Sequence, residues 1–254
     1  MHGSILILGS LLLDNGEREE WRRSHLSIDQ KVFVRVPVRY GRRSNSWGNT
    51  FTITLSSDGS AGSAVLVPNK ANIPDVNTLI GEARVLWKAE KRTVSQGDVG
   101  ASWGCVGVLF RAGVDSGGWL QVWAKYFGAN AHAISPVDGN GVFQIPWPTT
   151  LDGAPVDKDL ILAIAAKAEA TRPSVQDIAD AWLSQNQGNE RYFFENVRHG
   201  IRTPDDNLIW RRIEERNPHW LGNTSYAEPI ALLQSEAAEF SGTPTTTDEA
   251  SPSH

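Results

Sequence analysis

Cysteine is almost absent from the sequence, and this limits the chemistry that the chain can perform. The 254 residues include one cysteine, Cys105, which can form neither a disulfide nor a cysteine-based zinc site within one chain. Cys105 lies in the apolar run GCVGVLF, where we expect a small buried side chain and not a reactive thiol. No other spacing matches a metal motif, and no motif indicates a cofactor. We therefore expect neither a metal site nor a bound cofactor.

Excess positive charge is also missing, and the first apolar run is short. The formal net charge is −5, whereas non-specific nucleic-acid binding requires clustered Lys and Arg. The apolar run at residues 5–13 falls well below the roughly 20 residues of a membrane span. It has no basic segment before it and no small-residue cleavage site after it. We interpret it as a first core strand and expect a cytoplasmic protein with no nucleic-acid or membrane partner.

Strand patterns dominate the first part of the chain. Short alternating or apolar runs, bounded by Gly, Pro and Asn, predict strands at 4–8, 31–38, 50–55, 63–67, 104–110 and 142–145. Residues 14–23 are charged, and we expect them to be exposed. Periodicity leaves residues 119–127 and 159–170 undecided between helix and strand.

Helical spacing dominates after residue 174. Ser174 is a typical helix cap, residues 190–199 form a second helix, and a third opens at 203 with Leu208, Ile209 and Ile213 inward. This segregation of strands and helices predicts an α+β fold. We expect a strand-rich domain (1–150), a helical extension packed on it (151–235) and a disordered polar tail (236–254).

One earlier helix, predicted over residues 74–90, carries a carboxylate in an unusual place. Apolar residues recur at intervals of three and four along it, which makes a continuous apolar stripe. Continuing that spacing places Glu90 near the middle of the stripe. Glu90 is then either a solvated residue at the end of the helix or a carboxylate at the rim of an apolar cavity.

A glycine turn ends the first predicted strand. Gly9-Ser10 interrupts the apolar run, and a glycine there lets the backbone turn and present consecutive N–H groups to an anion. Ser10 adds a hydroxyl donor. The simpler interpretation is an ordinary turn after a core strand.

An N-terminal apolar strand that runs into Gly9-Ser10-Leu11 resembles the gamma-glutamylcyclotransferase-like (AIG2-like) family over about residues 4–112. That family has a mixed β-barrel and a catalytic glutamate later in the chain, for which Glu90 in LWKAE is the best match. The chain departs from the family at Leu8, which occupies the position of a tyrosine, and at 87–89, which replaces a short acidic run. Residues 150–220 lie outside the family core.

The resemblance implies a specific reaction. The α-amine of the substrate attacks its own γ-amide carbonyl, which gives 5-oxoproline and a free amine. Glu90 would move the proton as general acid and base, which requires an apolar setting that raises its pKa. Gly9, Ser10 and Leu11 would bind the substrate carboxylate.

Three arginines and two polar clusters complete the candidates. Arg39, Arg42 and Arg43 surround a polar loop and could pair with an anionic group, and we select Arg42 as a binding residue. Two further groupings match no established motif, so we expect neither a metal site in the first nor a hydrolase in the second. These groupings are His199, Asp205, Asp206 and His219, and Ser10, His25 and Asp29.

Two functions from different classes remain open. The first is a gamma-glutamylcyclotransferase-like enzyme that cyclises or cleaves a γ-glutamyl-type amide. The second is a catalytically silent protein that binds a small anionic ligand, or a protein partner through its Trp-rich C-terminal half. Whether Glu90 and Ser10 share one cavity discriminates between an acid–base site and a solvated glutamate.

Overall fold

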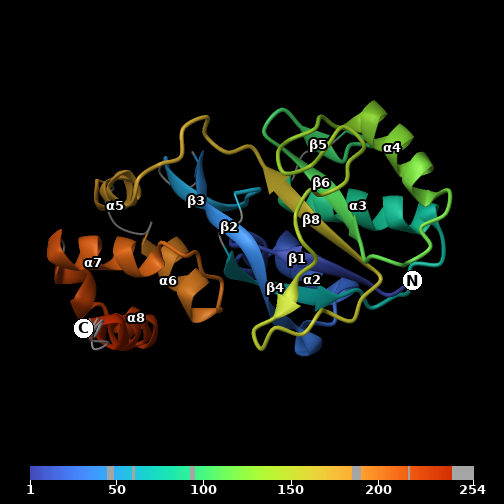
Figure 1. Ribbon diagram of the computed structural model, residues 1–254. Coiled ribbons are helices and arrows are strands. Elements are labelled where there is room, and N and C mark those ends of the chain that lie inside the picture. The colour runs from blue at the N-terminus through green and yellow to red at the C-terminus, as the bar shows by residue number, and fades with distance from the viewer. Residues whose placement is uncertain (45–48, 59–60, 92–94, 185–189, 217, 242–254) are drawn as a thin grey trace, which may run out of the picture.

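The computed structural model describes residues 1–44, 49–58, 61–91, 95–184, 190–216 and 218–241. Its strands form a mixed eight-stranded sheet in the order β3-β2-β4-β1-β8-β6-β5, with β7 paired to β2 (Figure 1). The strands are β1 (Gly3–Ile7), β2 (Val32–Ser44), β3 (Thr50–Leu55), β4 (Ala61–Pro68), β5 (Gly100–Ala101), β6 (Gly104–Phe110), β7 (Thr149–Thr150) and β8 (Leu160–Ala166). The α+β class is confirmed.

The expected mixed β-barrel is not found as a closed barrel, because the sheet of the described residues is open. β3 and β5 are its two ends and do not pair with each other. Helix α5 (Val175–Leu183) packs against β3, so this edge is covered by a helix and not by another strand. The backbone after β8 approaches the bulged part of β2, where the Glu169 N–H donates to the Gly41 carbonyl at 2.6 Å. The sheet therefore curls without closing.

A strand from the middle of the chain completes the sheet. β8 pairs in parallel with β1 and antiparallel with β6, so it is a central strand of the structure. Its sequence LILAIAA is apolar throughout, as both faces of a central strand are covered. The strand-rich part of the fold thus continues to Ala166, beyond the expected boundary at residue 150.

Several strand predictions are confirmed in position, and one is wrong. Residues 142–145 contribute only isolated bridges at Val142 and Phe143. The undecided residues 119–127 belong to helix α4 (Trp119–Asn130). Residues 14–23, expected to be exposed, mostly belong to helix α2 (Glu17–His25), which buries Trp21 and Arg22.

Two helices begin directly after a capping residue. α3 (Val76–Glu90) starts after Asp75, whose carboxylate accepts the Thr78 N–H at 2.8 Å. α5 opens with a capping box between Ser174 and Asp177. The remaining elements are α1 (Ser10–Leu13), α6 (Glu190–Arg198), α7 (Asp206–Arg216), α8 (Ala227–Ser241) and the short 3₁₀ turns η1 (Ile28–Gln30), η3 (Pro218–Gly222) and η4 (Thr224–Tyr226).

Two predictions about the helical region need correction. Leu208, expected to face inward on α7, is 53% exposed, whereas Ile209 and Ile213 are fully buried. Residues 236–241, expected to be disordered, belong to α8, and residues 242–254 lie outside the described part of the chain.

The C-terminal helices α5–α8 gather beside β2 and β3 (Figure 1). Aromatic side chains join the two parts: the Trp182 ring lies edge-on to Tyr40 of β2 at 5.7 Å and to Tyr192 of α6 at 6.1 Å. Trp182, Trp210 and Trp220 are buried in this core, so these tryptophans pack within the chain itself. A protein partner for this half of the chain stays a prediction.

No helix in the described part of the chain has the length and apolar character needed to cross a membrane.

Candidate functional site

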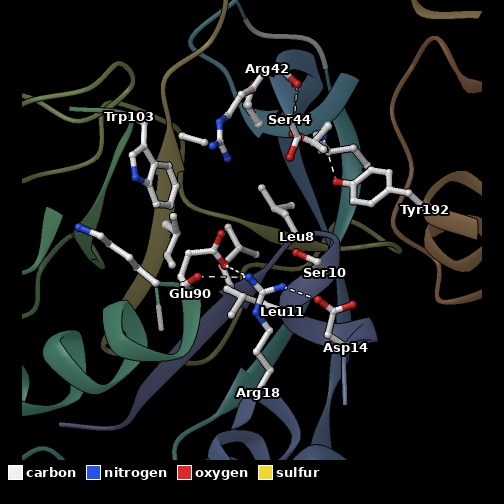
Figure 2. A pocket seen from close by; sticks show the side chains of 17 residues that line it. Leu8, Ser10, Leu11, Asp14, Arg18, Arg42, Ser44, Glu90, Trp103 and Tyr192 are labelled. Atoms are coloured by element: carbon white, nitrogen blue, oxygen red, sulfur yellow. Dashed lines mark hydrogen bonds and ion pairs between the residues drawn. The ribbon is translucent and has the colours of Figure 1, made fainter. Parts of the chain in front are cut away.

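A cavity of about 670 Å³ lies where the curled sheet meets α1, α2, the end of α3 and α6 (Figure 2). Four of the five predicted site residues line it: Ser10, Leu11, Arg42 and Glu90. The other lining residues are Leu6, Leu8, Asp14, Arg18, Ser44, Thr52, Ile53, Thr54, Lys91, Trp103, Ile164, Ala166 and Tyr192. Three cationic side chains and two carboxylates are present, which favours an anionic ligand.

Gly9, the fifth predicted residue, sets the turn that carries Ser10 and Leu11 into the cavity wall. Its φ of 63° and ψ of −131° belong to a region that only glycine occupies readily. A Cβ at this position would lie 2.5 Å from the Tyr192 hydroxyl. Gly9 is therefore needed for its backbone conformation and for its lack of a side chain.

Glu90 ends helix α3 at the cavity, with a side chain that is 16% exposed. The stripe of α3 buries Leu79, Ala83, Leu86 and Trp87, and Glu90 follows it as the spacing predicts. Burial raises the pKa of the Glu90 carboxyl, although the nearby guanidinium groups of Arg18 and Arg42 act in the opposite direction. A carboxyl with a raised pKa can exchange a proton closer to neutral pH than an ordinary glutamate.

Arg18 connects Glu90 to α2 and was not identified from the sequence. Its Nη2 donates to Glu90 Oε2 at 3.1 Å, and its Nη1 donates to Asp14 Oδ2 at 2.6 Å. Its Nε also donates to the Ala89 carbonyl at 3.2 Å. The charged pattern of residues 14–23 gives no sign of the contact with Glu90, because Glu90 is 72 positions away.

Arg42 enters the cavity from β2 with its guanidinium stacked on an indole. The Arg42 Cζ lies 4.4 Å from the centroid of the Trp103 ring, and Trp103 stacks in turn on the buried Trp87 at 5.1 Å. Burial lowers the pKa of Arg42, opposed by the charge of Glu90. The side chains of Arg42 and Glu90 point toward the same space (Figure 2). Stacking holds the guanidinium in place and leaves its edge for an anion.

The other two arginines of the polar loop take different roles. Arg39 donates from Nε to the Ser56 hydroxyl at 3.2 Å and lines another cavity. Arg43 is exposed, lies over the Phe51 ring at 4.3 Å and donates to the Asn49 carbonyl. Residues 45–48 of that loop lie outside the described residues.

Tyr192 of α6 is the second lining residue that the sequence did not indicate. Its hydroxyl accepts the N–H of Ile53 at 3.1 Å across 139 positions and lies against Gly9. Burial strongly raises the pKa of the Tyr192 phenol, so it is a neutral group of the wall. Leu8 lines the cavity as an apolar side chain. The helical region therefore forms part of this cavity.

The remaining candidates lie elsewhere. His25 faces Glu82 at 3.5 Å, His199 faces Glu195 at 3.6 Å, and Asp205 pairs with Arg172 at 3.1 Å. Asp206 is buried at the start of α7, paired with Arg202 at 2.9 Å. No cluster of His, Cys, Asp and Glu that could hold a metal ion occurs in the described part of the chain. Burial raises the pKa of Cys105 to about 12, as expected for an unreactive thiol.

Comparison with known proteins adds no relative. No family model matches the chain, and neither a curated protein nor a solved structure shows a significant match.

Proposed function

We propose that the chain is a gamma-glutamylcyclotransferase-like enzyme that converts a γ-glutamyl-type amide into 5-oxoproline and a free amine. The observation that carries the proposal is the shared cavity: Glu90, Arg42 and the Ser10-Leu11 turn line one hollow although they are distant in the sequence. The resemblance at Gly9-Ser10-Leu11 and the position of Glu90 supply the reaction class.

Glu90 is the proton carrier of this mechanism. Its carboxylate takes the proton of the substrate α-ammonium, and the freed amine attacks the γ-carbonyl carbon. A new C–N bond closes the ring and the amide C–N bond breaks. Protonated Glu90 then returns the proton to the leaving nitrogen, and the second proton that the ring nitrogen loses passes through the same carboxylate to the departing amine, which leaves as an ammonium. The raised pKa of Glu90 suits both steps, because a carboxyl titrating nearer neutrality can both accept and donate.

Arg42 and the glycine turn hold the substrate carboxylate. The guanidinium is fixed by Trp103, and Ser10 adds a hydroxyl on the facing wall. A charge-assisted contact here fixes the α-amine near Glu90 and restricts the flexible substrate to a ring-forming conformation.

One observation favours the alternative of a silent binding protein. Glu90 Oε2 is already engaged by Arg18, whose charge opposes the rise in the Glu90 pKa. In that case the cavity binds a small anion through Arg42 without turnover.

Incubation with γ-glutamyl amines tests the proposal directly. We expect stoichiometric release of 5-oxoproline and amine, measured by chromatography. Saturable binding of the same compounds without formation of 5-oxoproline would reject the enzyme and support the silent binding protein.

A further inference from the structure

A second cavity, of about 580 Å³, lies beside the first. Both cavities are lined by neighbouring residues of the same segments, but no residue lines both. Thr54, Trp103 and Ala166 line the first cavity, whereas Leu55, Ser102 and Lys167 line the second. Thr54 and Leu55 are consecutive residues of β3, and their side chains point to opposite faces, so the two cavities share β3 as a wall.

Arg39 lines this second cavity, and one nitrogen of its guanidinium has no acceptor among the described residues. Its side chain is 16% exposed, its Nε donates to the Ser56 hydroxyl at 3.2 Å, and Asp58 approaches the same nitrogen at 3.6 Å. The Nη1 of Arg39 is buried and meets no acceptor among the residues that the structure describes. A buried charged donor without an acceptor is unfavourable, so an anion that reaches this guanidinium would be bound preferentially.

The other polar groups of the cavity are mostly donors. Lys167 brings an ammonium group, His132 an imidazole, and Ser57, Ser102 and Ser135 hydroxyls that can donate. Glu169 is the opposing carboxylate of the lining, and its Oε1 accepts the backbone N–H of Arg43 at 3.3 Å.

The carboxylate closest to Arg39 is also shared. Asp58 pairs with Arg172 at 3.2 Å, so its charge does not belong to Arg39 alone. The cavity therefore combines two cations with several hydroxyls against one lining carboxylate, a set that matches an oxyanion with many acceptor oxygens.

We propose that the second cavity binds a phosphate group, either as inorganic phosphate or as a phosphomonoester. Arg39 and Lys167 pair with its oxygens, and the serine hydroxyls donate to those that remain. A tetrahedral phosphate offers more acceptor oxygens and more charge than a carboxylate, so acetate binds more weakly here. This binding does not depend on the reaction proposed for the first cavity.

The test is a titration of the full-length chain with inorganic phosphate, with glycerol 3-phosphate and acetate as parallel ligands at constant ionic strength. Calorimetry measures the affinity, and changes in amide NMR shifts locate the binding site. We expect saturable phosphate binding that Arg39→Gln weakens at least about tenfold. Lys167→Gln, at an exposed position, weakens it less. A tighter complex with glycerol 3-phosphate identifies the ester as the preferred form.

Two matched variants locate the binding. Arg35→Gln removes an exposed charge from the same strand, where Arg35 bonds the Leu151 carbonyl, and should leave the affinity unchanged. Arg42→Gln changes the first cavity and should also leave it unchanged. If Arg39→Gln does not fold, the phosphate affinity of Lys167→Gln is compared with that of the two control variants instead. Absence of saturable binding, equal affinity in all variants, or loss in Arg42→Gln alone would overturn the proposal.

Discussion

Arg18 of α2 and Glu90 of α3 form an ion pair with Nη2 and Oε2 3.1 Å apart, although 72 positions separate them. The pair sits at the cavity wall, where burial raises the pKa of Glu90 and Arg18 counteracts that rise. The charge of Arg18 therefore helps to set the pH at which Glu90 can accept a proton.

Replacing Arg18 should move the pH dependence of turnover. Activity requires ionised Glu90, so kcat/KM falls as the pH drops through its pKa. Arg18→Gln removes a charge that lowers this pKa, and the acid limb of the profile should shift to higher pH. The profile of kcat/KM between pH 4 and 9 measures the shift. Arg23→Gln, on the same helix and exposed, is the control. An acid limb that moves to lower pH in Arg18→Gln would contradict the assignment.

Removing the Arg42 guanidinium should weaken substrate binding. Loss of a charged hydrogen bond of this kind costs roughly 1.5–3 kcal/mol, so Arg42→Gln should lower kcat/KM by about 10- to 100-fold. Steady-state kinetics with a γ-glutamyl amine measure the change. Arg43→Gln removes the neighbouring exposed charge outside the cavity and should change kcat/KM by less than about twofold. Equal effects of the two substitutions would exclude a binding role for Arg42.

Gly9 should tolerate no side chain. Gly9→Ala combines a positive φ with a Cβ 2.5 Å from the Tyr192 hydroxyl, and we expect a loss of about 1–3 kcal/mol in the free energy of unfolding. Urea denaturation measures it. Gly81→Ala in α3, where a Cβ meets nothing within 4 Å, should instead stabilise the chain by about 0.5–1 kcal/mol. Tyr192→Phe should recover part of the loss in Gly9→Ala, because it removes the closest atom.

The parts of the site with local sequence signals could be predicted. The three- and four-residue spacing of α3 places Glu90 at the end of an apolar stripe, and the glycine turn places Ser10 and Leu11 after a buried strand. These signals depend on neighbours within a few residues. Their meeting in one cavity required the resemblance, since no local pattern relates residue 10 to residue 90.

The parts that depend on distant contacts could not be predicted. The apolar sequence of β8 is compatible with a buried helix or a buried strand. Its pairing with β1 and β6 makes it a strand. In the sequence, Tyr192 is one of several aromatic residues in a predicted helix. In the structure, its hydroxyl accepts the Ile53 N–H and lies against Gly9. The barrel prediction failed because helix α5 packs against the β3 edge. This helix lies outside residues 4–112, to which the family resemblance is limited.

Glu90→Gln should remove the activity without unfolding the chain. Because folding raises the pKa of Glu90, the ionised carboxylate destabilises the fold, and this penalty is fully present above the raised pKa. Glutamine avoids the penalty but loses the pair with Arg18, so the melting temperature should stay within about 4 °C.

The rate of 5-oxoproline formation from a γ-glutamyl amine by wild type and Glu90→Gln is the most direct measurement. Loss of the proton carrier should lower kcat by about 10²–10⁴-fold. Unchanged turnover in folded Glu90→Gln would contradict the mechanism.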